Sequence, residues 1–244
     1  MKKVYSIYLN KAMRKIIFIA IILAGIMSSA NAQTWKIGFE TGVGTYRMDQ
    51  LKEFNAALVF PFDTKLMSDF PAFIYYQSSI HRIFNQSSLG LSVAFQSTGS
   101  KISRKDYSGE YYFNNTVYSS SLCVNYEKLI TSFKNLNFNV YSEAGAIYSY
   151  LVMKEFLQIN NTVIADDLTE LVAFNYIFEP GINFSYQFSK IALGLNIGYA
   201  VQIGNGAFHL HGEKEAILIE PDTGDKVTPD WTGIRVGLSV GYQW

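Results

Sequence analysis

The chain has 244 residues, of which 16% are aromatic and 16% carry a charge. Charges are scarcer than the quarter or so usual in soluble domains, and the chain is too apolar and aromatic for disorder. Formal net charge is zero, but all five charges in residues 1–32 are positive, which leaves 15 basic and 20 acidic residues in 33–244. That acidic balance argues against a nucleic-acid partner, which needs a basic surface. The single cysteine, Cys123, excludes an intramolecular disulfide.

The first segment has the organisation of a secretory signal peptide. Basic residues at 11–15 precede an apolar run of about a dozen residues at 16–27, and this run is too short for a membrane-spanning helix of roughly 20 residues. Ala30 and Ala32 then form a small-x-small cleavage site, which predicts Gln33 as the first mature residue.

We therefore expect two parts, a signal peptide at 1–32 and one β-domain at 33–244. Met13 is an alternative start to Met1, because the residues before it are surplus to the signal.

After the leader, the hydrophobic period is two, which predicts β-strands. The clearest alternation runs from Ile191 to Ile203, where Ile, Leu, Tyr and Val share one face and Gly, Asn, Ala and Gln share the other. In 72–84 the facing is less clear, although Ile74, Tyr76 and Ile80 favour one side. Eight segments alternate in this way: 35–46, 72–84, 89–95, 118–126, 136–150, 174–186, 191–203 and 234–244.

The connections between these segments alternate in length. Short turns are expected at 85–88, 131–135 and 189–190. Long loops are expected at 48–70, 98–112, 152–170 and 204–231. Short turns on one side and long loops on the other are typical of transmembrane β-barrels.

The chemistry of the two faces supports a barrel in a membrane. A soluble barrel buries its apolar face inside, whereas the small polar face here is the one that fits the narrow interior of eight strands. The sequence predicts an all-β fold, an eight-stranded antiparallel up-and-down transmembrane β-barrel. Ten strands are the alternative, if 56–62 adds strands. Apolar residues at 48, 51, 54 and 58 have helical spacing, so the first loop contains either a short helix at the mouth of the barrel or a loop that packs on its own aromatic residues.

The last strand carries a resemblance to a known family. Tyr242 and the terminal Trp244 end an alternating apolar strand that resembles the C-terminal assembly signal of outer-membrane barrels. With the leader and the strand–loop rhythm, residues 33–244 resemble the outer-membrane β-barrel domain family, the small OmpA/OmpX-type barrels often called porins. The resemblance implies a multi-pass barrel in the cell outer membrane of a Gram-negative bacterium. It implies contacts with outer-membrane lipid and lipopolysaccharide, and with the barrel assembly machinery during biogenesis.

A few charges are expected inside the barrel. Glu40, Glu143, Glu179 and Arg235 form the predicted polar cluster of the lumen, with Lys36 as a further inward charge. The favoured interpretation is a structural ion-pair network, because buried charges need partners. The alternative is a polar pathway with a perturbed carboxylate, because three Glu face one Arg and one Lys.

Catalytic and metal-binding signals are weak. His209, His211 and Glu213 would share a face, and imidazole with carboxylate can bind zinc, but solvated loop residues are the simpler interpretation. His81 has no clear facing, and no G-x-S-x-G elbow is present. We expect no cofactor and no metal site.

Three functions remain from the sequence. The first is a non-enzymatic barrel with a structural or surface-interaction role, presenting long loops to an extracellular protein partner. The second is a small porin or transport barrel for a small solute or hydrophobic molecule. The third is a lipid-modifying barrel enzyme.

Overall fold

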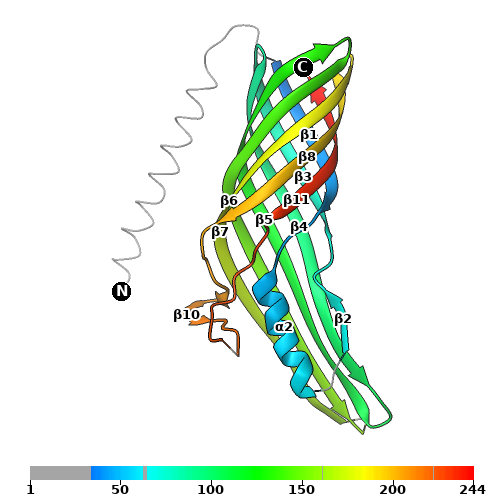
Figure 1. Ribbon diagram of the computed structural model, residues 1–244, viewed down its shortest axis with the longest axis vertical. Coiled ribbons are helices and arrows are strands. Elements are labelled where there is room, and N and C mark those ends of the chain that lie inside the picture. Colours follow the sequence, from blue (N-terminus) through cyan, green and yellow to red (C-terminus); the bar gives the residue numbers. More distant parts are fainter. Residues whose placement is uncertain (1–33, 63–64, 161, 222) are drawn as a thin grey trace. The chain divides into compact units, whose positions relative to one another are not determined.

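Eight long strands form a closed antiparallel ring in the computed structural model (Figure 1), which describes residues 34–62, 65–160, 162–221 and 223–244. The ring strands are β1 (Thr34–Gly44), β3 (Phe73–Phe84), β4 (Ser87–Lys105), β5 (Gly109–Phe133), β6 (Leu136–Ile159), β7 (Thr162–Phe188), β8 (Ile191–Ile203) and β11 (Gly233–Gln243). Each pairs with its neighbour in the chain, and β11 closes the ring against β1, from Lys36–Gln243 to Gly44–Arg235. The eight-stranded barrel is confirmed. The predicted signal peptide and its cleavage site at Ala30, Ala32 and Gln33 lie outside the described residues.

The facing predicted from the alternation holds around the ring. Outward residues such as Val93 are more than half exposed (56%), whereas the adjacent inward Ser92 is 3% exposed. Ile74, Tyr76 and Ile80 all face outward, which resolves the parity of β3. A continuous apolar outer wall with buried Ser, Asn and Gly inside is the arrangement that lipid requires, because the hydrocarbon offers backbone and polar groups no hydrogen bonds.

The first loop contains a helix, α2 (Asp49–Phe62), so the ten-stranded alternative through 56–62 is wrong. Its residues Leu51 and Phe54 are buried together with the preceding Met48, as the helical spacing predicted. Asp49 in the first turn is favourable beside the positive end of the helix dipole. Within the described residues, no helix has the length and apolar character needed to cross a membrane.

Two of the predicted long loops, 98–112 and 152–170, are instead strand. β4 runs on to Lys105 and β5 starts at Gly109, while β6 runs to Ile159 and β7 starts at Thr162. The four strands continue past the ends of β1, β8 and β11 as a protruding sheet (Figure 1). The alternation fades at this level because the outward face no longer meets lipid, while Ile102, Phe113 and Leu151 on the inner face become apolar and buried.

Shorter elements complete the loop side. β2 (Lys65–Asp69) pairs antiparallel with β4, from Lys65–Ser103 to Asp69–Ser100. β9 (His209–Leu210) and β10 (Glu213–Ile217) form a small hairpin in the last loop, and β9 pairs with β7 at Leu171 and Val172.

The barrel interior has two halves of opposite character. On the loop side, an apolar cluster, which we call the outer core, fills it. On the side of the short turns, the interior is lined by Asn, Ser, Gln, Gly and charged residues. Short turns lie on the periplasmic side of such barrels, so the polar half faces the periplasm and the outer core lies beneath the cell surface. The outer core consists of Met48, Leu51, Phe70, Phe73, Tyr75, Val117, Cys123, Ile147, Leu151, Leu171, Ala173, Ile177, Ala200, Phe208, Val227 and Trp231.

Candidate functional site

The lumen charges predicted from the sequence lie close together around one level of the barrel, and we call them the carboxylate cluster. Glu143 and Glu179 are direct cross-strand partners on β6 and β7. The guanidinium of Arg235 on β11 lies 3.2 Å from Glu179, and both side chains are more than nine-tenths buried. Tyr141 donates a second hydrogen bond to Glu179 at 3.0 Å. This buried pair has the geometry of the structural ion pair that we favoured.

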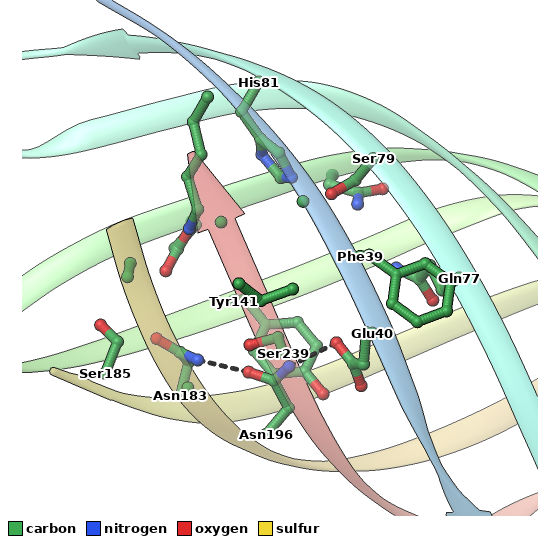
Figure 2. Close-up of a pocket in the computed structure, with 18 of the residues that line it drawn as sticks. Phe39, Glu40, Gln77, Ser79, His81, Tyr141, Asn183, Ser185, Asn196 and Ser239 are labelled. Atoms are coloured by element: carbon green, nitrogen blue, oxygen red, sulfur yellow. Dashed lines mark hydrogen bonds and ion pairs between the residues drawn. The ribbon is translucent and has the colours of Figure 1, made fainter. Parts of the chain in front are cut away.

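Glu40 and Glu143 accept hydrogen bonds from neutral donors. Glu40 receives the hydroxyl of Tyr75 at 2.5 Å and the amide of Asn196, the latter drawn in Figure 2. Glu143 receives the amides of Gln77 at 2.7 Å and Asn125 at 2.9 Å. Two donors to each carboxylate offset part of the cost of moving it out of bulk water.

Arg235 also lies against the boundary of the outer core. Its guanidinium carbon is 5.7 Å from the ring centre of Phe73 and 5.8 Å from that of Tyr75. Among the described residues, Nε and one terminal nitrogen of Arg235 have no hydrogen-bond partner. The aromatic faces therefore stabilise the part of the cation that the carboxylate does not reach.

Two glycines make room for the carboxylate cluster. A Cβ on Gly198 would lie 2.4 Å from a carboxylate oxygen of Glu179 and 2.5 Å from the hydroxyl of Tyr141. A Cβ on Gly237 would lie 2.3 Å from both Glu40 and Tyr75. Inward glycines on β8 and β11 are thus needed to accommodate the polar side chains from nearby strands.

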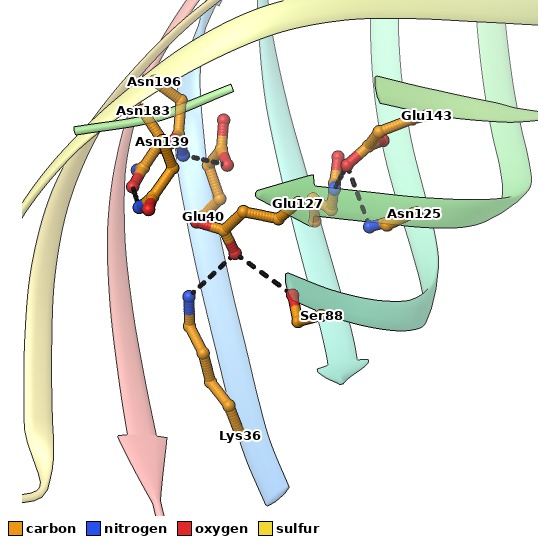
Figure 3. Close-up of polar contacts among 10 residues, drawn as sticks. Lys36, Glu40, Ser88, Asn125, Glu127, Asn139, Glu143, Asn183 and Asn196 are labelled. Atoms are coloured by element: carbon orange, nitrogen blue, oxygen red, sulfur yellow. Dashed lines mark hydrogen bonds and ion pairs between the residues drawn. The ribbon is translucent and has the colours of Figure 1, made fainter. Parts of the chain in front are cut away.

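A second polar group, missed from the sequence, lies nearer the periplasm. Lys36, predicted to face inward, pairs with Glu127 at 3.4 Å, and Ser88 donates to the same carboxylate oxygen (Figure 3). Continuing the alternation of 118–126 by one residue would have placed Glu127 inside. His81, whose facing was uncertain, is buried and faces the lumen.

Two cavities occupy the polar half. One of about 70 Å³ is lined by Glu40, His81, Glu143 and Asn196 among others. Another of about 160 Å³ reaches the periplasmic turn at Asn85 and Gln86, and the two share Lys36 and Glu127 as lining residues. These volumes accommodate a few water molecules.

The outer core closes the interior above the carboxylate cluster. Trp231 is fully buried there, and its indole nitrogen donates to Ser149 Oγ at 3.0 Å. The loop that carries Trp231 is tied to α2, because the backbone and hydroxyl of Thr228 both donate to Gln50, at 2.8 and 2.7 Å. Trp231 and Phe208 from the last loop and Leu51 from α2 therefore belong to one packed unit.

The remaining residues named from the sequence are the histidines of the last loop and the aromatic residues of the last strand. His209 is half-buried in β9 and its ring contacts the carbonyl of Ala207, while His211 is exposed. Residues 34–244, apart from the undescribed positions, contain no group of three or more His, Cys, Asp or Glu placed to hold a metal. Tyr242 and Trp244 stack at 6.2 Å on the outer wall, and Trp35 and Trp244 exchange backbone hydrogen bonds at the seam of the barrel.

Above the membrane, α2 packs on the inner face of the protruding sheet. The amide of Asn55 donates to Ser100 at 2.8 Å, and Asn115 donates to Asn55 at 2.6 Å. Phe54 and Phe113 add an aromatic contact at 6.4 Å. The sheet is therefore supported along its inner face and presents its outer face, its tips and its edges to the exterior.

Comparisons with known proteins give only solved structures of low sequence identity and TM-scores below 0.5. No family model matches the sequence, and the search of curated proteins found no match. Among solved structures, Ail of Yersinia pestis, crystallised with a heparin analogue, is 9% identical with a TM-score of 0.43, covering 87% of this chain and 98% of its own. A major outer membrane protein of Thermus thermophilus is 10% identical with a TM-score of 0.44, covering 86% and 99%. The N-terminal barrel of Pseudomonas aeruginosa OprF is 12% identical with a TM-score of 0.31, covering 86% and 97%.

The closed ring, the apolar outer wall and the short periplasmic turns belong to one architecture. The protein folds as an eight-stranded antiparallel up-and-down β-barrel with the apolar outer wall of a barrel that crosses a membrane with its strands.

Proposed function

We propose that this protein works as a surface-interaction barrel, holding a rigid sheet above the outer membrane for an extracellular partner. The observation that carries the proposal is the continuity of β4, β5, β6 and β7 from the barrel wall into the protruding sheet. A folded sheet supported by α2 presents a fixed surface, and a preordered surface loses less conformational entropy on binding than a mobile loop does.

The closed interior favours the same role. The outer core and the buried Arg235–Glu179 pair occupy the space that a solute would need to cross. A transport barrel is the second candidate, and the polar cavities on the periplasmic side are the observation that favours it. We propose a non-enzymatic role over the lipid-modifying alternative, because the buried His81 faces the lumen and not the outer wall where lipid lies.

A trimmed variant tests the proposal. Residues 101–114 and 154–168 are each replaced by Asn-Gly, which cuts both hairpins at paired positions, Lys101–Asn114 and Lys154–Leu168. The barrel wall and the Asn55–Ser100 contact remain, so a heat-modifiable band should persist. Bacteria expressing the trimmed variant should lose adhesion to immobilised extracellular-matrix proteins that the full-length protein confers. Equal adhesion by both strains, together with reduced solute uptake by the trimmed strain, would support transport instead.

A further inference from the structure

The protruding sheet has two edges, and they differ in how far other strands cover them. The β4 edge is covered by β2, which adds as an antiparallel strand over Ser100–Ser103. The β7 edge is covered by β9 only at Leu171 and Val172. Above Glu170, none of the described strands pairs with this edge. Residues 162–169 therefore present a free strand edge above the membrane.

The backbone direction along this edge follows from one hydrogen bond. The amide of His211 donates to the carbonyl of Glu170 at 3.1 Å, so the polar groups of Glu170 face away from β6. In a strand the N–H and C=O groups of alternate residues point to the same side. The N–H and C=O groups of Asp166 and Leu168 therefore also point to the free side, whereas those of Asp167 and Thr169 bond to β6.

The charge and apolar character of the edge define what fits it. Residues 162–170 include Asp166, Asp167 and Glu170 and no basic residue. Leu168 and Ile164 are both 59% exposed. Lys154 contacts Asp166 at 3.5 Å, but both side chains are largely exposed and the segment keeps a negative balance.

We infer that the β7 edge over 164–169 binds an extended basic segment of an extracellular polypeptide, which adds to the sheet as one more strand; this deepens the proposed function and rests on it. Strand addition supplies backbone hydrogen bonds, and the side chains opposite each edge residue supply specificity. An antiparallel segment reading apolar–basic–basic places its apolar residue opposite Leu168 and its basic pair opposite Asp167 and Asp166. Beyond Ala165 the register of β7 shifts, so Ile164 lies at the outer end of the regular edge. His211 already occupies the position opposite Glu170, so it sets the lower end of the added strand and its register.

A second copy of this chain fits the edge poorly. Two β7 edges paired antiparallel about the acidic pair would bring Asp166 of each copy opposite Asp167 of the other, and like charges directly opposite are destabilising. The edge thus favours a basic partner over self-association.

The test uses the full-length protein in detergent micelles and a fluorescein-labelled peptide, Thr-Val-Lys-Arg-Thr-Val-Thr. Leu168→Pro removes one N–H from the free side without removing a bond to β6, and proline is tolerated at such edge positions. We expect Leu168→Pro to weaken peptide binding by about tenfold or more, and the matched variant Leu168→Thr, which keeps the N–H, by less than about threefold. The heat-modifiable band checks that both variants still fold.

Changes in the protein and in the peptide separate the contribution of charge to binding from that of backbone hydrogen bonds. Asp166→Asn with Asp167→Asn should abolish the preference for the Lys-Arg peptide over a Glu-Glu control. A backbone N-methylated Lys-Arg peptide, which keeps the charge and loses strand pairing, should not bind. Equal binding of the N-methylated peptide, unchanged binding to Leu168→Pro, or a cross-linked dimer in place of peptide binding would overturn the inference. If Leu168→Pro cells adhere normally while the trimmed strain does not, the edge is excluded and the surface role stands.

Discussion

At Arg235 three interactions meet: a carboxylate at 3.2 Å, two aromatic faces and the boundary of the outer core. Removing one partner of a buried ion pair leaves the other charge without compensation, which costs more than the pair contributes net. Arg235 and Glu179 therefore depend on each other inside the barrel, and a double-mutant cycle measures their coupling.

We predict that Arg235→Met destabilises the barrel by roughly 3 kcal/mol, because Glu179 then remains buried and unpaired. Glu179→Gln in the Arg235→Met background should recover much of that loss, since a neutral amide needs no cation. Urea unfolding in lipid vesicles measures all three variants. Additive destabilisation by the two substitutions would show that the pair is not coupled.

At the scale of the strand, the same outward face serves two environments. Leu195 on β8 and Leu168 on β7 both face outward, but Leu195 lies within the apolar wall and Leu168 on the protruding sheet. We predict that Leu195→Arg costs roughly 2–4 kcal/mol of folding free energy, as for arginine facing the bilayer midplane. Leu168→Arg is the matched control and should change stability by less than about 0.5 kcal/mol. A neutral Leu195→Arg in vesicle unfolding would place that face away from lipid.

The last strand joins the first, and its end has a further predicted role. Trp244 exchanges backbone hydrogen bonds with Trp35 and stacks on Tyr242 at the periplasmic rim. We predict that deleting Trp244 reduces insertion into the outer membrane, because the terminal aromatic resembles the assembly signal and belongs to the interfacial aromatic girdle. Quantifying heat-modifiable barrel in isolated outer membranes checks this, with Trp35→Phe as a control that keeps the C-terminus. Unchanged yield after the deletion would refute it.

For the whole molecule, the packing of the outer core determines whether ions or solutes can pass through the barrel interior. We predict that the purified protein shows no porin-like conductance in planar bilayers, because eight strands leave an interior only wide enough for side chains. Replacing residues 205–230 by a short Gly-Asn link removes Phe208 and Val227 from the outer core and should permit small, brief openings. The hairpin-trimmed variant, which keeps Phe208 and Val227, should show no conductance. Stable large steps from the wild-type protein would contradict a closed interior.

Strand number, facing and the inward charges followed from the sequence because lipid imposes a strict period of two on every spanning strand. The same rule ceases at the membrane surface, so the strands at 98–112 and 152–170 were mistaken for loops. Tyr75 and Asn125 escaped notice as partners of Glu40 and Glu143 because their contacts depend on the register between neighbouring strands. Gln77 reaches Glu143 from a strand that is not its neighbour, and no local pattern indicates that contact. The outer core joins Met48 to Trp231, and a contact over that separation has no local pattern.

The uninterrupted strands also have a mechanical consequence. Residues 110–118 of β5, 150–159 of β6 and 162–173 of β7 contain neither glycine nor proline. At roughly 3.3 Å per residue, the nine or so residues above Tyr118 and above Tyr150 form a lever of about 30 Å without a hinge. A partner that pulls sideways on the tip therefore applies a torque to the barrel wall, and the barrel has to tilt in the bilayer before the sheet bends.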